Sequence, residues 1–225
     1  MPRHLIFDLD GTLVDSVGIT VAIINQMLAA RGRAPNASPA VARAHVSAGG
    51  EGMIKAVMGG ACDDPVAAIA EFRRIHAETP TPPGSLFPGV ATGLQQLADA
   101  GFTLSICSNK PQNLCEKVLA DLGVADHFAL VVGSRPGFAR KPAPDLLQLV
   151  MDQLGAVPGD CLFVGDSELD LQAAEHFAMC FVLVEWGYVE DPQTLNAVPG
   201  GHRLVATMPA LVDLVMALRL DGVAS

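Results

Sequence analysis

Near its start the chain reads Leu5-Ile6-Phe7-Asp8-Leu9-Asp10-Gly11-Thr12, a short apolar run that ends abruptly in acidic and glycine residues. A run of this kind is typical of a buried strand, and Asp and Gly are common turn residues. The sequence therefore predicts a strand over residues 5–7 and a loop over residues 8–12. An apolar run interrupted this early by an acid is not the core of a signal peptide.

The rest of the chain alternates between strand and helix patterns. One segment with helical spacing begins at Pro111 and closes at Gly123, and a second runs from Pro144 to Gly155. Strands alternating with helices of this length predict an α/β fold with a doubly wound, Rossmann-like parallel sheet. The further strands are expected at residues 103–107, 130–132, 161–164 and 180–184.

One gap, between Asp10 and the turn at Pro88, is too long for a single crossover helix. Its apolar spacing predicts helices over residues 17–30 and 67–76, and the proline-rich residues 79–84 are typical of a linker. The sequence thus predicts a helical cap domain inserted into the α/β core. We expect the core to comprise residues 1–15 and 85–225, and the cap residues 16–84.

Composition narrows the class of protein. Half of the residues are hydrophobic and 17% are charged, which allows a large core and excludes an intrinsically disordered chain. The net charge of −10 argues against nucleic acid or an anionic membrane as a partner, and the longest apolar run, residues 177–184, is too short to cross a bilayer. The five cysteines form no CxxC pair, which favours reduced thiols in a cytoplasmic protein. A monomer and a homodimer are both compatible with these observations.

Polar residues follow several of the predicted strands. Ligands of such sheets bind outside the carboxyl ends of the strands, so we expect these residues to converge on one edge. Lys141 is expected at the start of the helix that precedes the strand at 161–164. The residues that follow strands are Asp8, Asp10, Ser108, Asn109 and Asp166.

This set of residues indicates phosphoryl chemistry. Asp8, Asp10 and Asp166 would repel one another unless Lys141 and a hard divalent cation neutralised them. A site with few protein ligands, completed by substrate oxygens and water, is typical of Mg²⁺. A carboxylate beside a cation can attack phosphorus, and a second aspartate can move a proton to the leaving oxygen.

The phosphoryl oxygens need donors of their own. We expect Ser108, Asn109, Lys141 and the backbone N–H groups around Gly11 to bind them.

Simpler interpretations exist for parts of this pattern. Asp-x-Asp-Gly-Thr can be a turn, and Ser167 with Asp170 fits a helix capping box. We favour a capping role for Ser167, and leave Asp170 open between capping and orienting the site, where Thr12 is also expected to act. Arg43 and Lys55 in the insert are expected to be solvated.

Taken together, the chain resembles the haloacid dehalogenase superfamily of phosphohydrolases. Residues 7–16 are similar to the family's nucleophile motif and Ser108 to its second motif. Residues 141–144 are similar to its lysine motif, and residues 164–170 to its metal motif. The four motifs occur in the family's order and cover nearly the whole chain.

The resemblance implies roles for these residues. It implies that Asp8 is the nucleophile that forms an aspartyl-phosphate and that Asp10 is the general acid/base. It also implies Mg²⁺ held by the carboxylates of Asp8 and Asp166 and the main-chain carbonyl of Asp10, with Lys141 completing the catalytic set. The helical insert resembles the small cap of the subclass that includes phosphoglycolate phosphatases.

The implied substrate is a small phosphorylated metabolite. Residues 108–111, 141–144 and 186–188 are most similar to phosphoglycolate phosphatases, which makes phosphoglycolate the first candidate. A sugar phosphomutase and a non-catalytic protein that binds a phosphate ligand stay open as alternatives.

Two further features bear on the resemblance. The cap loop, with Ser47, Gly49 and Gly50, is where we expect specificity for the substrate. Ala178 stands where the family usually has a glycine, and glycine normally ends a helix in a left-handed conformation. We therefore expect Ala178 to change how the chain leaves that helix.

Overall fold

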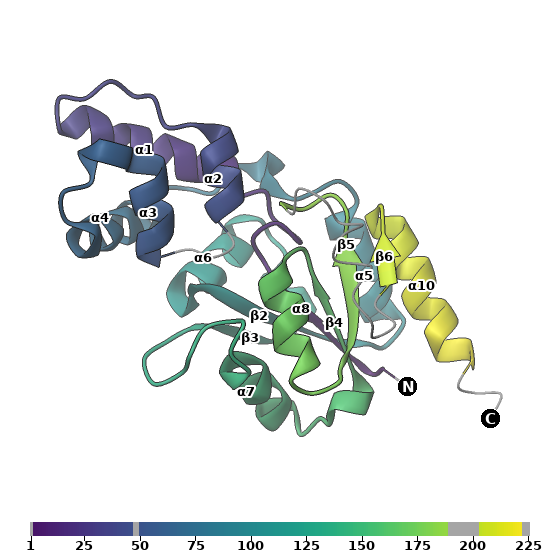
Figure 1. The fold of residues 1–225 in the computed structure, drawn as a ribbon. Coiled ribbons are helices and arrows are strands. Elements are labelled where there is room, and N and C mark those ends of the chain that lie inside the picture. The colour runs from purple at the N-terminus through teal and green to yellow at the C-terminus, as the bar shows by residue number, and fades with distance from the viewer. Residues whose placement is uncertain (1, 47–49, 189–202, 222–225) are drawn as a thin grey trace.

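A six-stranded parallel sheet forms the centre of the molecule in a computed structural model that describes residues 2–46, 50–188 and 203–221 (Figure 1). The strand order is β3-β2-β1-β4-β5-β6, and every neighbouring pair is parallel. This confirms the predicted α/β class with a helical insert. The strands are β1 (His4–Phe7), β2 (Thr103–Pro111), β3 (Phe128–Ser134), β4 (Cys161–Gly165), β5 (Cys180–Val184) and β6 (Arg203–Val205).

Helices cover both faces of the sheet, which is why its strands are apolar on both sides. Leu5 and Phe7 of β1 belong to one apolar cluster, and Ile6 between them belongs to another on the opposite face. The first cluster includes residues of α5 (Val90–Asp99), α6 (Gln112–Asp121) and α10 (Met208–Asp221), and the second includes residues of α7 (Asp145–Leu154) and α8 (Glu168–Glu175). In the described parts of the chain, no helix has the length and apolar character that a membrane crossing requires.

The register of the strands sets the position of the site. Phe7, the last residue of β1, pairs with Ile106 of β2 on one side and with Val164 of β4 on the other. The residues that follow these three strands therefore lie at the same carboxyl edge. The chain leaves β1 for strands on one side first and returns to β4 on the other, and this switch point is where such sheets bind ligands.

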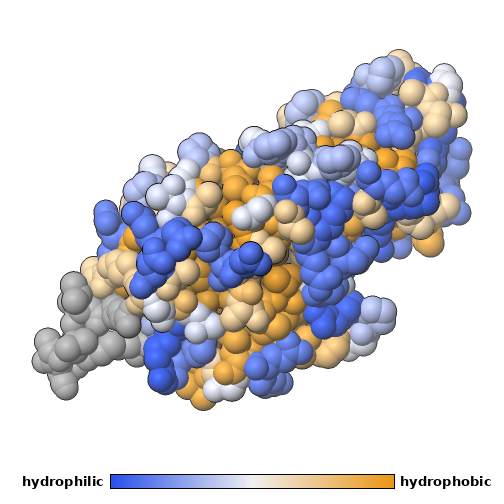
Figure 2. Space-filling view, turned by 180° about the vertical axis from the view of Figure 1, so that it is seen from behind, coloured by the Kyte–Doolittle hydropathy of each residue, from blue (hydrophilic) through white to orange (hydrophobic). Residues whose placement is uncertain are grey.

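The insert between β1 and β2 is a second group of helices with its own apolar cluster (Figure 1, upper left). Asp64 begins the last of them as an N-cap, because its carboxylate accepts hydrogen bonds from the N–H groups of Val66 and Ala67 at 3.0 Å each. Seen from behind, hydrophilic residues cover much of this smaller lobe, while larger apolar areas lie on the part that contains the sheet (Figure 2). The helices are α1 (Val17–Ala30), α2 (Pro39–His45), α3 (Gly50–Met58) and α4 (Pro65–Glu78).

Some element boundaries differ from those predicted. The strand β2 continues to Pro111, so α6 begins one residue later than the proline suggested. Lys141 lies in the loop before α7 and does not start that helix, because prolines at positions 142 and 144 disfavour helical geometry in the residues before them. The strand β6 was not predicted, since three residues are too few to form a recognisable pattern.

Ala178 adopts the left-handed conformation that a glycine would take, with φ of 48°. The N–H of Met179 still reaches back to the carbonyl of Ala174 at 3.1 Å, which closes the end of α8. The expectation that Ala178 changes the helix exit was therefore wrong. Met179 is buried in the core on the α8 side of the sheet, and this packing holds the turn in place despite the Cβ.

Candidate active site

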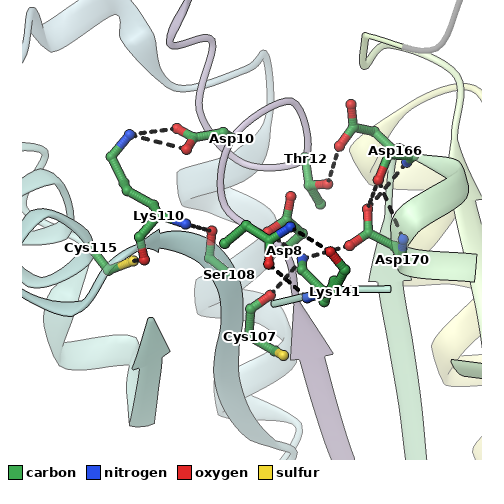
Figure 3. A network of polar contacts seen from close by, with 12 residues as sticks. Asp8, Asp10, Thr12, Cys107, Ser108, Lys110, Cys115, Lys141, Asp166 and Asp170 are labelled. Carbon is green, nitrogen blue, oxygen red and sulfur yellow. Dashed lines mark hydrogen bonds and ion pairs between the residues drawn. The ribbon is translucent and has the colours of Figure 1, made fainter. Parts of the chain in front are cut away.

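Four charged side chains meet at the carboxyl edge of the sheet (Figure 3). Asp8 follows β1, Asp166 follows β4, Asp170 lies in the first turn of α8, and Lys141 comes from the loop before α7. The carboxylates of Asp8, Asp166 and Asp170 offer ligand atoms that lie within 4.8 Å of one another. All four side chains are buried, with at most 4% of each residue exposed.

Lys141 is the cation at the centre of this group. Its Nζ donates hydrogen bonds to Asp8 Oδ1 at 2.8 Å, Asp170 Oδ1 at 2.6 Å and the carbonyl of Cys107 at 2.9 Å. Three donors satisfy three acceptors, so the ammonium is fixed in one position. Burial alone would lower the pKa of Lys141, but the charges of Asp170 and Asp8 outweigh burial and raise it. The lysine therefore stays charged.

The carboxylates are not fully neutralised by one lysine. Burial raises the pKa of Asp8 to about 7, although Lys141 opposes the shift. Burial, followed by the charges of Asp170 and Asp8, raises the pKa of Asp166 well above its usual value. Three buried acids share one cation, and a second positive charge would favour the ionised form of all of them.

Two glycines, Gly11 and Gly187, leave room for the side chain of Asp166 at the carboxyl edge of the sheet. A Cβ on Gly11 would lie 2.2 Å from Asp166 Oδ2, and a Cβ on Gly187 would lie 2.2 Å from the Asp166 Cβ. Thr12 Oγ1 and the N–H of Tyr188 donate to the two Asp166 oxygens at 3.2 and 2.8 Å. Thr12 thus contacts Asp166, in line with the orienting role expected for it.

The donor set of this cluster is oxygen alone, which is the set that hard cations such as Mg²⁺ prefer. The excess of buried carboxylates over cations at this cluster fits a bound divalent ion. The family resemblance implied a metal held by Asp8, Asp166 and the main chain of Asp10, whereas the carboxylates that cluster are those of Asp8, Asp166 and Asp170. Both oxygens of Asp170 are engaged by Lys141 and Ser167, so Asp170 positions the lysine.

Ser167 and Asp170 form the capping box that the sequence suggested. Ser167 Oγ accepts a hydrogen bond from the N–H of Asp170, and Asp170 Oδ2 accepts one from the N–H of Ser167. The structure confirms capping for Ser167. Asp170 both caps the helix and orients the site: one oxygen accepts from the N–H of Ser167, and the other binds Lys141.

The carboxylate of Asp10 points away from Asp8, towards Lys110 (Figure 3). Lys110 Nζ donates to both Asp10 oxygens, at 2.9 and 3.0 Å, and Ser16 Oγ donates to one of them. Both charged side chains are about nine-tenths buried, with 10% of Lys110 and 9% of Asp10 exposed. The sequence pointed to Lys110 only as part of residues 108–111 and gave it no partner, because nothing local in the sequence connects it to Asp10 or Ser16.

Asn109 holds the loop that carries Lys141. Its carboxamide oxygen accepts from the N–H of Lys141 at 2.8 Å, and its Nδ2 donates to the carbonyl of Lys141 at 3.0 Å. Ser108 Oγ accepts a hydrogen bond from the N–H of Lys110 at 3.3 Å. The binding of phosphate by Ser108 and Asn109 remains a prediction, and for Asn109 the structure adds the positioning of Lys141.

Tyr188 connects the site to the insert, a role that the resemblance of residues 186–188 did not indicate. Its hydroxyl accepts a hydrogen bond from the N–H of Ser16 at 2.6 Å and donates one to Asp15 Oδ1 at 3.0 Å. The guanidinium of Arg43 lies 5.1 Å from the centre of the Tyr188 ring, and Arg43 Nη1 donates to the carbonyl of Gly187. Arg43 was expected to be merely solvated, but it bridges the insert and the core because the fold places α2 above Tyr188.

A cavity of about 40 Å³ lies between the carboxyl edge of the sheet and the insert. On the core side it is bordered by Asp10, Asn109 and Lys110, and on the insert side mainly by apolar residues. Gly50 lies on its border, whereas Ser47 and Gly49 fall outside the described residues. The insert residues on this border are Thr20, Val46, Gly50, Met53, Ile69, Phe72 and Arg73.

Comparison with known proteins shows the family to which this chain is similar. The family model of the haloacid dehalogenase-like hydrolases matches residues 5–184. A phosphoglycolate phosphatase of Rhodobacter capsulatus is 33% identical over 221 residues, covering 95% of this chain and 98% of that protein. A phosphoglycolate phosphatase of Xanthomonas campestris is 36% identical over 202 residues, covering 87% of this chain and 90% of that protein.

Solved structures agree on the fold. The crystal structure of a predicted phosphoglycolate phosphatase from Haemophilus somnus 129PT superposes with a TM-score of 0.84 at 23% identity, and covers 95% of this chain and 98% of that chain. A haloacid dehalogenase-like hydrolase from Bacteroides fragilis superposes with a TM-score of 0.78, also at 23% identity, covering 93% of this chain and 99% of that chain. At this identity the likeness concerns the fold.

Proposed function

Because this chain belongs to the haloacid dehalogenase-like hydrolases, we propose that it is a Mg²⁺-dependent phosphatase that hydrolyses a small phosphorylated metabolite through an aspartyl-phosphate. The observation that carries the proposal is the buried group of Asp8, Lys141 and Asp166 at the switch point of the sheet. Phosphoglycolate is the first candidate substrate, because the relatives at 33% and 36% identity are phosphoglycolate phosphatases.

Asp8 is the proposed nucleophile. Lys141 binds its Oδ1, which leaves Oδ2 for attack on phosphorus as the bond from phosphorus to the ester oxygen breaks. Asp10 is the proposed general acid and base, and for this its carboxylate has to turn from Lys110 towards the substrate and take up a proton. It gives that proton to the leaving oxygen, then takes one from the water that attacks the aspartyl-phosphate. The second step releases inorganic phosphate and restores the Asp8 carboxylate.

The proposed metal ligands are the carboxylates of Asp8 and Asp166 with the main-chain carbonyl of Asp10. When bound, Mg²⁺ supplies positive charge that offsets the negative charges of the nucleophile and the phosphoryl group. Lys141 supplies the second positive charge, and its three hydrogen bonds keep it beside Asp8.

The helical insert is the proposed cap of this site, over residues 16–84, with the core formed by residues 1–15 and 85–225. Its apolar side chains beside Asp10, which include Val46, Met53 and Phe72, would keep water away while Asp8 attacks. Hydrolysis of the intermediate needs a water, so the cap has to open and close in each cycle. The five free cysteines fit a reducing compartment such as the cytoplasm.

A panel of phosphate esters tests the function. We expect the purified protein to release inorganic phosphate from phosphoglycolate with Mg²⁺, to lose this activity with a chelator, and to regain it when Mg²⁺ is restored. Conversion of a sugar phosphate to its isomer without phosphate release would instead identify a phosphomutase. Binding without turnover of any ester would contradict the proposal and identify a non-catalytic phosphate-binding protein.

A further inference from the structure

A second and larger cavity lies beside the small one, between the insert and the loop that follows β3. Its volume is about 640 Å³, and Arg73 of α4 and Pro111 border both cavities. Among the described residues that border both cavities, Arg73 is the only charged one. It therefore faces both the space beside Asp10 and the outer cavity. The remaining border is mostly polar and includes Gln112, Arg135 and Arg140.

Three guanidinium groups face this outer cavity without an ion-pair partner. Within the described ranges, Arg73, Arg135 and Arg140 lie within 4.0 Å of no carboxylate oxygen, whereas the neighbouring Arg74 pairs with Glu78 at 2.9 Å. Arg135 donates instead to the neutral side chain of Gln112. Unpaired cations that converge on one cavity are an arrangement that favours an anionic ligand.

Arg73 and Arg140 come from different parts of the molecule, yet both border the outer cavity, and the charge of Arg140 acts on Arg73. Burial lowers the pKa of Arg73, and the positive charge of Arg140 lowers it further, while Glu51 of α3 acts in the opposite direction. Arg140 Nη1 also lies 2.7 Å from the position that a Cβ on Gly50 would occupy. The guanidinium of Arg140 thus lies beside the start of α3, in space that a Cβ at Gly50 would otherwise need.

We propose that Arg73 of the insert and Arg140 of the core form a subsite for a second anionic group of the substrate, a carboxylate or a phosphate remote from the phosphoryl group that is transferred. This inference rests on the proposed phosphatase function and adds the class of substrate. Arg73 borders the space beside Asp10, so a small ester could reach it from the site of attack.

The subsite also accounts for how an anionic substrate can bind to a protein with a negative net charge. The chain carries a net charge of −10, and an anionic substrate would be repelled by such a surface unless cations were gathered at the entrance to the site. Arg73 belongs to the insert and Arg140 to the core. An anion held by both would therefore draw the two parts together over the transferred phosphoryl group.

Kinetics on three esters that differ only at the remote end test the subsite. Phosphoglycolate carries a carboxylate there, 1,2-ethanediol bisphosphate carries a second phosphate, and 2-hydroxyethyl phosphate carries a neutral hydroxyl. In Arg73→Gln we expect the KM for the preferred anionic ester to rise by about 10- to 100-fold with kcat nearly unchanged. The KM for 2-hydroxyethyl phosphate should change by less than about 2-fold. Comparison of the two anionic esters identifies which anion the subsite takes.

Arg74→Gln is the matched control, because Arg74 is the next residue on the same helix and is exposed in its pair with Glu78. It should leave all three KM values unchanged. An equal effect of Arg73→Gln on all three esters, or no effect on any, would overturn the subsite while leaving the phosphatase proposal intact.

A binding measurement separates the two proposals if no ester is hydrolysed. Calorimetry with 3-phosphonopropanoate and propylphosphonate compares a carboxylate with a methyl group on stable analogues. We expect the wild type to bind the carboxylate analogue more tightly by about 10-fold, and Arg73→Gln to lose this preference. Equal affinity of the wild type for both analogues would overturn the subsite.

Discussion

The carboxyl edge of the sheet and the facing surface of the insert border the same small cavity but are built differently. At the sheet edge, the charged groups are buried and tied to one another, with Lys141 bound to three acceptors and Asp10 bound to Lys110. The insert contributes apolar side chains and one arginine that pairs with no carboxylate within the described ranges. Under the proposed function this difference separates two tasks: the edge would hold Asp8 and Lys141 in fixed positions, and the insert would select what reaches them.

Removing the nucleophile should have the largest effect. Asp8→Asn keeps the size of the side chain but removes the attacking oxygen, so we expect kcat to fall by at least ~1,000-fold while the protein still folds. Phosphate release from the best ester of the panel, together with a circular dichroism spectrum, measures both.

The control for this variant is Asp160→Asn. Asp160 pairs with Arg3 at the opposite end of the strands and should tolerate the change with full activity. Turnover near the wild-type level in Asp8→Asn would rule out the aspartyl-phosphate route.

The fixed geometry of the edge can be tested through Gly187. A Cβ at this position would lie 2.2 Å from the Asp166 Cβ, so Gly187→Ala must displace Asp166 or its loop. We expect kcat/KM to fall by about 10- to 100-fold and the Mg²⁺ concentration needed for half-maximal activity to rise. Gly159→Ala is a matched control, because no atom lies within 4 Å of the Cβ it would add. Unchanged kinetics in Gly187→Ala would mean that the edge tolerates movement of Asp166.

In the metal-free protein, lowering the pH should change the contributions of the two regions to folding stability in opposite directions. Burial raises the pKa of Asp8 from 3.8 to about 7, so the folded state binds more protons between these values and Asp8 favours folding as the pH falls. Burial in the insert lowers the pKa of His76 from 6.5 to about 3, so the unfolded state binds more protons there and stability is lost as the pH falls below 6.5.

Thermal unfolding in chelator at about pH 7.5 and about pH 5.5 measures both contributions. Between these two pH values, the free energy of unfolding of the wild type should rise by about 2 kcal/mol relative to Asp8→Asn. It should fall by about 1 kcal/mol relative to His76→Gln. The same sign for both differences would contradict the contrast between the two regions.

The smallest effect concerns Ala178, far from the insert. Its φ of 48° is unfavourable for a residue with a Cβ, so Ala178→Gly should raise the free energy of unfolding by about 1 kcal/mol. Denaturant unfolding measures this change, and activity should stay as in the wild type. A destabilised Ala178→Gly protein would show that the side chain contributes more by packing than the backbone loses by strain.

Local patterns were sufficient to predict the strands that are apolar on both faces, the helix start at Ser167, and the acidic residues at the strand ends. These features depend on neighbours in the chain, so the sequence displays them directly. The helix exit at Ala178 was predicted wrongly, because buried packing of Met179 overrides the preference of a single residue for its backbone conformation.

The fold class and the residues at the carboxyl edge could be predicted without the structure, because strand positions and chain order follow from periodicity and connection length. The pairs that these residues form are visible only in the packed structure: Asp10 pairs with Lys110, and Asp170 pairs with Lys141. The same packing brings Arg73 of the insert and Arg140 of the core to the border of one cavity. The partners in each pair are well separated along the chain. Their contact depends on how the helices of the insert and the loops of the core pack in space, which no local pattern records.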